Sequence, residues 1–130
     1  MKACRVEIVT FAGGNRSRFT SVGSFCERED GFTAVYSDEG DEVLLGLSGN
    51  ALTMDRQGGN AIRAHFSEGE TGELSIGCPD GSGGVPMITE VCAARRMRDG
   101  WRIALRYRLM FAEVQIYRLT IAVNIISEEQ

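Results

Sequence analysis

Apolar and polar residues alternate with a period of two along almost the whole chain, and this pattern constrains the fold more than any other feature of the sequence. Such alternation is typical of strands that bury one face. No window keeps the spacing of an amphipathic helix long enough to predict one. Sixteen glycines and only two prolines favour many tight turns between strands that use every backbone donor. The sequence therefore predicts an all-β protein.

The alternation divides into ten segments of strand length, separated by turn sequences such as Gly49-Asn50 and Asp99-Gly100. The predicted strands are 3–11, 16–27, 32–37, 42–48, 51–57, 61–66, 73–78, 87–97, 101–111 and 115–126. The connection 79–86 is longer than the others and holds both prolines. No linker divides the chain, so we expect residues 1–130 to form one domain.

Ten strands joined by successive hairpins would leave long edges in an open sheet, and such edges promote aggregation. Closure of the sheet removes the edges. We therefore expect a single closed or nearly closed antiparallel up-and-down β-barrel of about eight to ten strands. A barrel of this size is either filled by its own side chains or holds one small ligand.

The register of two neighbouring hairpins follows from the requirement that each strand bury one face. A two-residue loop at Gly49-Asn50 places Val43 opposite Arg56, on the inner face of the barrel. The next hairpin then places Asp55 beside Arg63 on the outer face.

The register of a third hairpin is predicted from the turn at Asp99-Gly100. A type I turn followed by a left-handed Gly100 pairs Met97 with Trp101. This register points Arg95 into the barrel.

Arg56 is the most informative residue, because an unpaired guanidinium on an apolar inner face is strongly destabilising. One hypothesis is that Arg56 and Arg95 bind the anionic head group of a small ligand at the barrel mouth, with the Tyr36 and Tyr107 hydroxyls as further donors. The alternative is structural. Each arginine then reaches solvent or pairs with a backbone carbonyl or an acidic side chain.

Six arginines lie between residues 95 and 108, opposed by the single acid Asp99. However, the chain has a net charge of −4 and an isoelectric point near 5.0, and it lacks the patterns of RNA-binding sheets and zinc fingers. We therefore expect no nucleic-acid partner. The Arg95–Arg108 hairpin is instead predicted to be a solvated face or a contact for a protein partner.

Motifs for enzymatic chemistry are missing from the sequence. We find no nucleophile elbow, phosphate-binding loop or dinucleotide fingerprint. His65 has no ligand residues at suitable spacing, and the acidic turn 38–42 lacks the alternating oxygen ligands of a calcium loop, so it is predicted to be a solvated hairpin tip. We expect no enzyme activity, no cofactor and no bound metal.

The cysteines and the N-terminus indicate the cellular compartment. The four cysteines include no close pair, and Cys4 and Cys78 follow the apolar alternation, which favours reduced and buried thiols. The N-terminal residues form no apolar signal region, and no stretch is long enough to cross a membrane as a helix. We expect a cytoplasmic protein without membrane contact.

Several short fragments, taken together, resemble the bacterial YwiB-like family of uncharacterised proteins. These fragments are Gly23-x-Phe25, Tyr36, Gly49-Asn50, Met54-x-Arg56-x-Gly58, Phe66-x-x-Gly69, Pro79-Asp80-Gly81 and Tyr107-x-Leu109. The resemblance covers nearly the whole chain and implies a calycin- or lipocalin-like barrel. The chain departs from the family at Cys78, where an aromatic residue is common. No established activity comes with this resemblance.

Two hypotheses of function follow. The first is an intracellular protein that binds a small amphipathic or anionic molecule inside the barrel. The alternative is a filled barrel that acts as a protein–protein interaction module through its arginine-rich outer hairpin.

Overall fold

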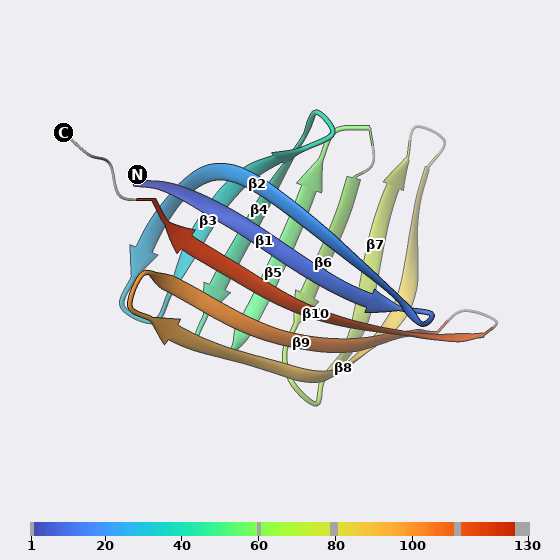
Figure 1. Ribbon diagram of the computed structural model, residues 1–130. Coiled ribbons are helices and arrows are strands. Elements are labelled where there is room, and N and C mark those ends of the chain that lie inside the picture. Colours follow the sequence, from blue (N-terminus) through green and yellow to red (C-terminus); the bar gives the residue numbers. More distant parts are fainter. Residues whose placement is uncertain (1, 60, 79–80, 111–112, 127–130) are drawn as a thin grey trace.

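Ten antiparallel strands close into a barrel (Figure 1). The computed structural model describes residues 2–59, 61–78, 81–110 and 113–126. The strands are β1 (Lys2–Ala12), β2 (Asn15–Arg28), β3 (Gly31–Asp38), β4 (Asp41–Ser48), β5 (Ala51–Gln57), β6 (Ala61–Phe66), β7 (Thr71–Cys78), β8 (Gly81–Met97), β9 (Gly100–Met110) and β10 (Val114–Ile125). Each strand pairs with its sequence neighbours, and β1 also pairs with β10. The predicted up-and-down barrel is confirmed. In the described ranges, no helix could span a membrane.

The interior of the barrel is packed with apolar side chains from alternate positions of the strands. Rings of Phe25, Phe32 and Trp101 follow one another with centroid separations of 5.5 and 5.8 Å. Other large, fully buried side chains are Leu45, Leu47, Leu52, Met87, Ile103, Leu105 and Ile121. Most of the barrel is therefore filled, as expected for small barrels.

The cysteines that the structure describes are free thiols. Cys4 and Cys92 are buried, Cys26 is exposed, and none of the three forms a disulfide. Burial raises the pKa of both buried thiols, which keeps them protonated. The prediction for Cys4 is confirmed, whereas the side chain of Cys78 lies outside the described residues.

The two short hairpins around β5 have the predicted register. Val43 lies opposite Arg56, and Asp55 lies opposite Arg63. The Asp55 and Arg63 side chains form an exposed ion pair with a separation of 3.5 Å. Local turn chemistry and the need to bury one face were sufficient to fix these pairings.

Neutralising this exposed pair is expected to have little effect on stability. The Arg63 side chain is 71% exposed, and exposed ion pairs contribute at most about 1 kcal/mol. The double variant Asp55→Asn/Arg63→Gln should therefore melt within a few degrees of the wild type. A much larger fall in melting temperature would show that the hairpin register is wrong.

The predicted long connection 79–86 is wrong, because β8 already begins at Gly81. Residues from Gly81 to Ile88 pair with β7 through backbone hydrogen bonds. These bonds need no particular side chain, so a glycine-rich stretch without apolar alternation gave no strand signal. Residues 79 and 80 themselves lie outside the described residues.

The predicted register of the β8–β9 hairpin is also wrong. Met97 lies opposite Gly100 instead of Trp101, and the register shifts between Thr89 and Val91. Glu90 is the extra residue of this β-bulge, which exchanges the two faces of β8.

The observed register between the bulge and the turn changes the position of Arg95. Cys92 and Ala94 face the interior after the bulge, and Arg95 lies opposite Arg102 on the outer surface. The prediction that Arg95 points inward is therefore incorrect.

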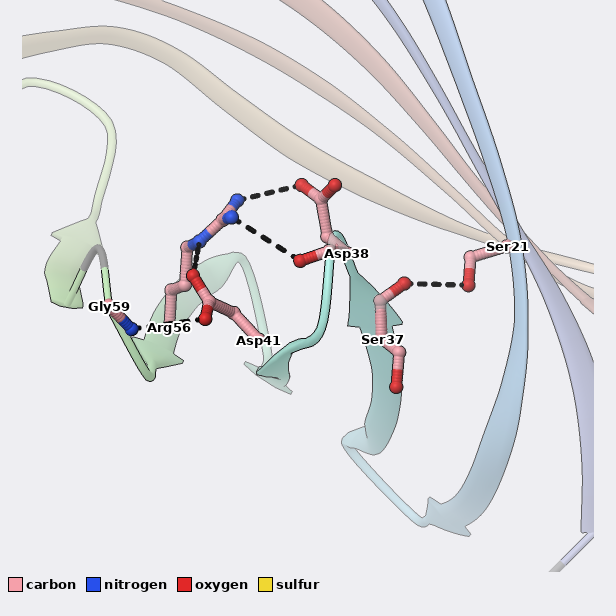
Figure 2. Close-up of polar contacts among 6 residues, drawn as sticks. All are labelled: Ser21, Ser37, Asp38, Asp41, Arg56 and Gly59. Atoms are coloured by element: carbon pink, nitrogen blue, oxygen red, sulfur yellow. Dashed lines mark hydrogen bonds and ion pairs between the residues drawn. The ribbon is translucent and has the colours of Figure 1, made fainter.

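The barrel opens where β2 and β3 separate. The two strands pair from Gly23–Tyr36 to Arg28–Gly31, and the preceding part of β2 pairs with β1 alone. Next to the Gly23–Tyr36 pair, where the pairing ends, the Ser21 hydroxyl donates a hydrogen bond of 2.9 Å to the carbonyl of Ser37 (Figure 2). This separation leaves room for a hollow at the mouth of the barrel.

Candidate functional site

A hollow of about 210 Å³ lies at the barrel mouth, between β1 and β2 on one side and β3 to β6 on the other. Its walls are Ile8, Phe19, Tyr36, Asp38, Val43, Met54, Arg56 and Ile62. Six of these eight side chains are apolar or aromatic, and the other two are charged. Such a combination is typical of small-molecule sites, in which a few polar groups orient an apolar ligand.

Arg56 forms ion pairs with two aspartates at the β3–β4 hairpin (Figure 2). Its Nη1 donates to Asp38 Oδ2 over 2.7 Å, and its Nε donates to Asp41 Oδ2 over 2.9 Å. Its Nη2 donates to the backbone carbonyl of Asp38 over 3.3 Å. The guanidinium is thus held through all three nitrogens, which supports the structural role over an anion clamp.

The two aspartates face each other across the hairpin. Asp38 lies opposite Asp41, and Asp41 is two residues from Val43 on the inner face of β4. Since Val43 lies opposite Arg56, the three charged side chains meet at one end of the barrel. The prediction that the acidic turn is solvated is wrong at Asp41, whose side chain is only 12% exposed. The register of the two hairpins already contained the signal for this contact.

Gly58 makes room for the Asp41 carboxylate. Its φ is +136°, and a Cβ at this position would overlap the Asp41 carboxylate oxygen. The neighbouring Gly59 donates its backbone N–H to Asp41 Oδ1 over 3.1 Å. The segment Met54-x-Arg56-x-Gly58 therefore acts as a unit, in which Met54 lines the hollow and the other two residues hold Asp41.

The environment of Arg56 preserves its charge. Burial alone would lower the pKa of the guanidinium, but the hydrogen bond to Asp41 and the charge of Asp38 raise this pKa above its ordinary value. The group of two carboxylates and one guanidinium carries a net charge of about −1 when all are ionised. The mouth is thus mildly anionic, not cationic.

Tyr36 and Tyr107 occupy different environments. Tyr36 is 5% exposed and lines the hollow, where its ring lies 5.6 Å from that of Phe19. Tyr107 lies between the rings of Phe66 and Tyr117, at 5.0 and 5.2 Å, and is not part of the hollow. Of the four predicted site residues, only Arg56 and Tyr36 lie together.

Both tyrosines are expected to make stability depend on alkaline pH. Burial raises the pKa of Tyr36 and of Tyr107 to about 12, and the nearby Asp38 charge adds to the effect at Tyr36. The folded state holds these protons above the pH at which the unfolded chain releases them, near pH 10. Their contribution is therefore complete below pH 10 and is lost as the pH rises through about 12, by roughly 3 kcal/mol for each group.

Urea unfolding measured from pH 9 to pH 12 tests this expectation. Tyr36→Phe and Tyr107→Phe should each reduce the loss of stability over this interval, because phenylalanine has no proton to release. An unchanged alkaline profile in both variants would contradict it.

No group of three or more His, Cys, Asp or Glu side chains that could hold a metal ion occurs among the described residues. His65 lies outside, where its Nδ1 is 3.1 Å from the Thr53 hydroxyl, as the register predicted.

Comparison with known proteins identifies similarities in sequence and in fold. A family model described as a domain of unknown function, DUF1934, matches residues 6–123. The crystal structure of the ywiB protein from Bacillus subtilis is similar, with a TM-score of 0.78 and 15% sequence identity, over 96% of this chain and 91% of that chain. No curated protein matches significantly. The structural likeness supports the barrel fold alone.

Proposed function

Because this chain belongs to the DUF1934 family, a domain of unknown function, we propose its function from its own geometry: it is a non-enzymatic protein that binds a small apolar amine at the barrel mouth. The observation that carries the proposal is the apolar hollow lined by the Asp38 carboxylate and the Arg56 guanidinium, with Asp41 paired to the same guanidinium outside the lining.

The size of the hollow limits the ligand. Its volume of about 210 Å³ equals the liquid volume of about seven water molecules. This volume lies below the ~300–1,000 Å³ of sites for drug-sized molecules. A single aromatic ring with a short side chain fits these dimensions, whereas a long acyl chain does not.

The charged rim determines which head group is favoured. Arg56 already donates to both aspartates, so an incoming carboxylate or phosphate would meet the Asp38 carboxylate and a guanidinium whose charge Asp41 also balances. Figure 2 shows that the second carboxylate oxygen of Asp38 points away from Arg56. We propose that this oxygen accepts a hydrogen bond from a ligand ammonium group. The sign of the ligand charge is thus opposite to that expected from the sequence.

The proposal is tested with two ligands of similar size and opposite charge, phenethylamine and 3-phenylpropionate. Titration calorimetry should detect binding of the amine, and NMR should show shifts of the Met54 and Ile62 methyl signals. Asp38→Asn should weaken amine binding about tenfold, the loss expected for one charged hydrogen bond.

Asp55→Asn provides the matched control, because Asp55 is an aspartate on the outer surface of the same strand as Arg56. This variant should bind the amine as the wild type does. Stronger binding of phenylpropionate than of phenethylamine, or no binding of either at millimolar concentration, would exclude the proposed ligand class.

A further inference from the structure

Arginines gather on the outer face formed by β8, β9, β10, β1 and the first half of β2, which lie side by side in Figure 1. Strands β8 to β10 contribute Arg95, Arg102, Arg106, Arg108 and Arg118. Strands β1 and β2 add Arg5, Arg16 and Arg18. We call this surface the arginine face. It unites arginines from both ends of the sequence, which counting along the β8–β9 hairpin could not reveal.

Few acids balance this charge. Glu90 lies 3.1 Å from Arg106 and 3.0 Å from Arg108, and Glu7 lies 2.6 Å from Arg18. These are the two acids among the outward positions of these strands, so the eight arginines leave the face with a charge of about +6. Since the whole chain carries −4, the remaining surface is strongly acidic. The arginine face is thus electrostatically separate from the rest of the molecule.

The arrangement of the arginines does not favour folding. Arg95 lies directly opposite Arg102, and Arg118 lies directly opposite Arg106. Like charges in cross-strand pairs are destabilising. Neither Arg95 nor Arg118 forms an ion pair with a carboxylate of the described chain. Glu90 compensates this repulsion only at Arg106, and an anionic partner on this face would relieve the remainder.

Small side chains separate the two arginine pairs. Ala93, Ala104 and Thr120 form a row across β8, β9 and β10, beside a shallow depression of about 280 Å³ that also reaches Arg95 and Arg102. Arg102 and Arg106 are four residues apart on β9, which separates the two rows of charge by about 13 Å. A row of small side chains therefore lies between two rows of guanidinium groups on this face.

An exposed aromatic ring lies beside the row that contains Arg106 and Arg118. Phe11 is 37% exposed, and the Arg118 guanidinium lies 4.9 Å from the centre of its ring. A second depression, of about 350 Å³, lies beside Phe11, Arg106 and Arg118. Aromatic rings next to arginines are the groups on which unpaired bases stack.

From these observations we propose, contrary to the expectation from net charge and sequence motifs, that the arginine face binds single-stranded nucleic acid. Arginine guanidinium groups bind phosphates in bidentate fashion, and Phe11 provides a stacking surface for one base. The centre of a protein interface is generally rich in large aromatic groups and poor in alanine, whereas this face has a row of alanines between its arginines. A two-fold contact between copies of this chain would place the arginines of one copy against those of the other, where they would repel. The acidic remainder of the molecule, screened beyond about 8–10 Å at physiological salt, confines binding to this face.

The test uses a fluorescein-labelled oligouridylate of about 12 nucleotides and measures its anisotropy with the full chain. Binding should weaken as salt rises from about 50 to about 200 mM, with a log–log slope near −0.7 for each phosphate contacted. Arg118→Gln should weaken binding about fivefold and make the slope shallower by about 0.7. Arg63→Gln removes the same charge from an exposed position outside the face and should change neither quantity.

A second variant separates nucleic acid from acidic protein. Phe11→Leu keeps an apolar side chain but removes the ring, and it should weaken oligouridylate binding at least about fivefold while leaving binding of an oligoglutamate peptide unchanged. Thermal melts establish that each variant is folded.

Three results would overturn the proposal. The first is no binding of oligouridylate at about 50 mM salt. The second is an equal loss of binding in Arg63→Gln and Arg118→Gln, which would indicate attraction by net charge alone. The third is binding of a nucleic-acid duplex or of oligoglutamate as strong as that of the single strand, because either would assign the face to another class of partner.

Discussion

Replacement of Arg56 by methionine is expected to lower the free energy of unfolding by about 3 kcal/mol, since removing one partner of a mostly buried ion pair leaves the other charges uncompensated. The Arg56 side chain is 16% exposed, and it is the cation that separates Asp38 from Asp41. Without it, two carboxylates face each other across the β3–β4 hairpin. Methionine keeps an unbranched apolar stem in place of the arginine stem, so the main change in the variant is the loss of the charged guanidinium.

Thermal and urea unfolding would measure this loss, which corresponds to a fall of roughly 10 °C in melting temperature for a domain of this size. Arg63→Met is the control, because it removes an exposed arginine from the neighbouring strand. The triple variant Arg56→Met/Asp38→Asn/Asp41→Asn should recover part of the loss by removing the opposed charges. A single Arg56→Met variant that keeps or gains stability would refute the structural role of this arginine.

Gly58→Ala is expected to be similarly destabilising, by about 3 kcal/mol. Part of this loss is backbone strain, because a φ of +136° is rarely adopted by residues other than glycine. The rest arises because the new methyl group would displace the Asp41 carboxylate from Arg56 and from the Gly59 N–H.

The neighbouring glycine is a matched control for this prediction. Gly59 has open space around its Cα and no positive φ, so Gly59→Ala should change the melting temperature little. Gly58 and Arg56 act on the same carboxylate. The double variant Gly58→Ala/Arg56→Met should therefore lose less stability than the sum of the two single losses. Full additivity, or equal effects of the two glycine substitutions, would contradict this account of the Asp41 contact.

The hairpins around β5 show how much of the fold is readable from sequence. Gly49-Asn50 permits a two-residue turn, and the alternation on both sides allows one register that buries Leu47 and Leu52. The same reasoning placed Arg56 on the inner face and Asp55 beside Arg63. Where a turn is short and each strand has one apolar face, local sequence is sufficient to predict the register of the hairpin.

The predicted start and register of β8 are wrong for separate physical reasons. The stretch from Gly81 to Pro86 is held by backbone hydrogen bonds to β7, which leave no periodic signature in the side chains. The bulge at Glu90 then exchanges the faces of the strand, and alternation alone cannot reveal one inserted residue. Arg95 lies between this bulge and the turn, where the observed pairing of Met97 with Gly100 instead of Trp101 moves its side chain to the outer face.

The sequence by itself determined the all-β class, the ten strands, the closure of the barrel and the requirement that Arg56 have a partner, because periodicity and turn chemistry act over a few neighbouring residues. The hairpin register indicated where that partner would lie, but only the tertiary structure decided that two aspartates share Arg56 and how the arginines assemble. Asp38 and Asp41 reach Arg56 because two hairpins end at the same side of the barrel. Arg5, Arg16 and Arg118 join the arginines of β9 because closure places β1 beside β10. Both contacts join segments that are distant in sequence, and their formation depends on the register of every strand between them.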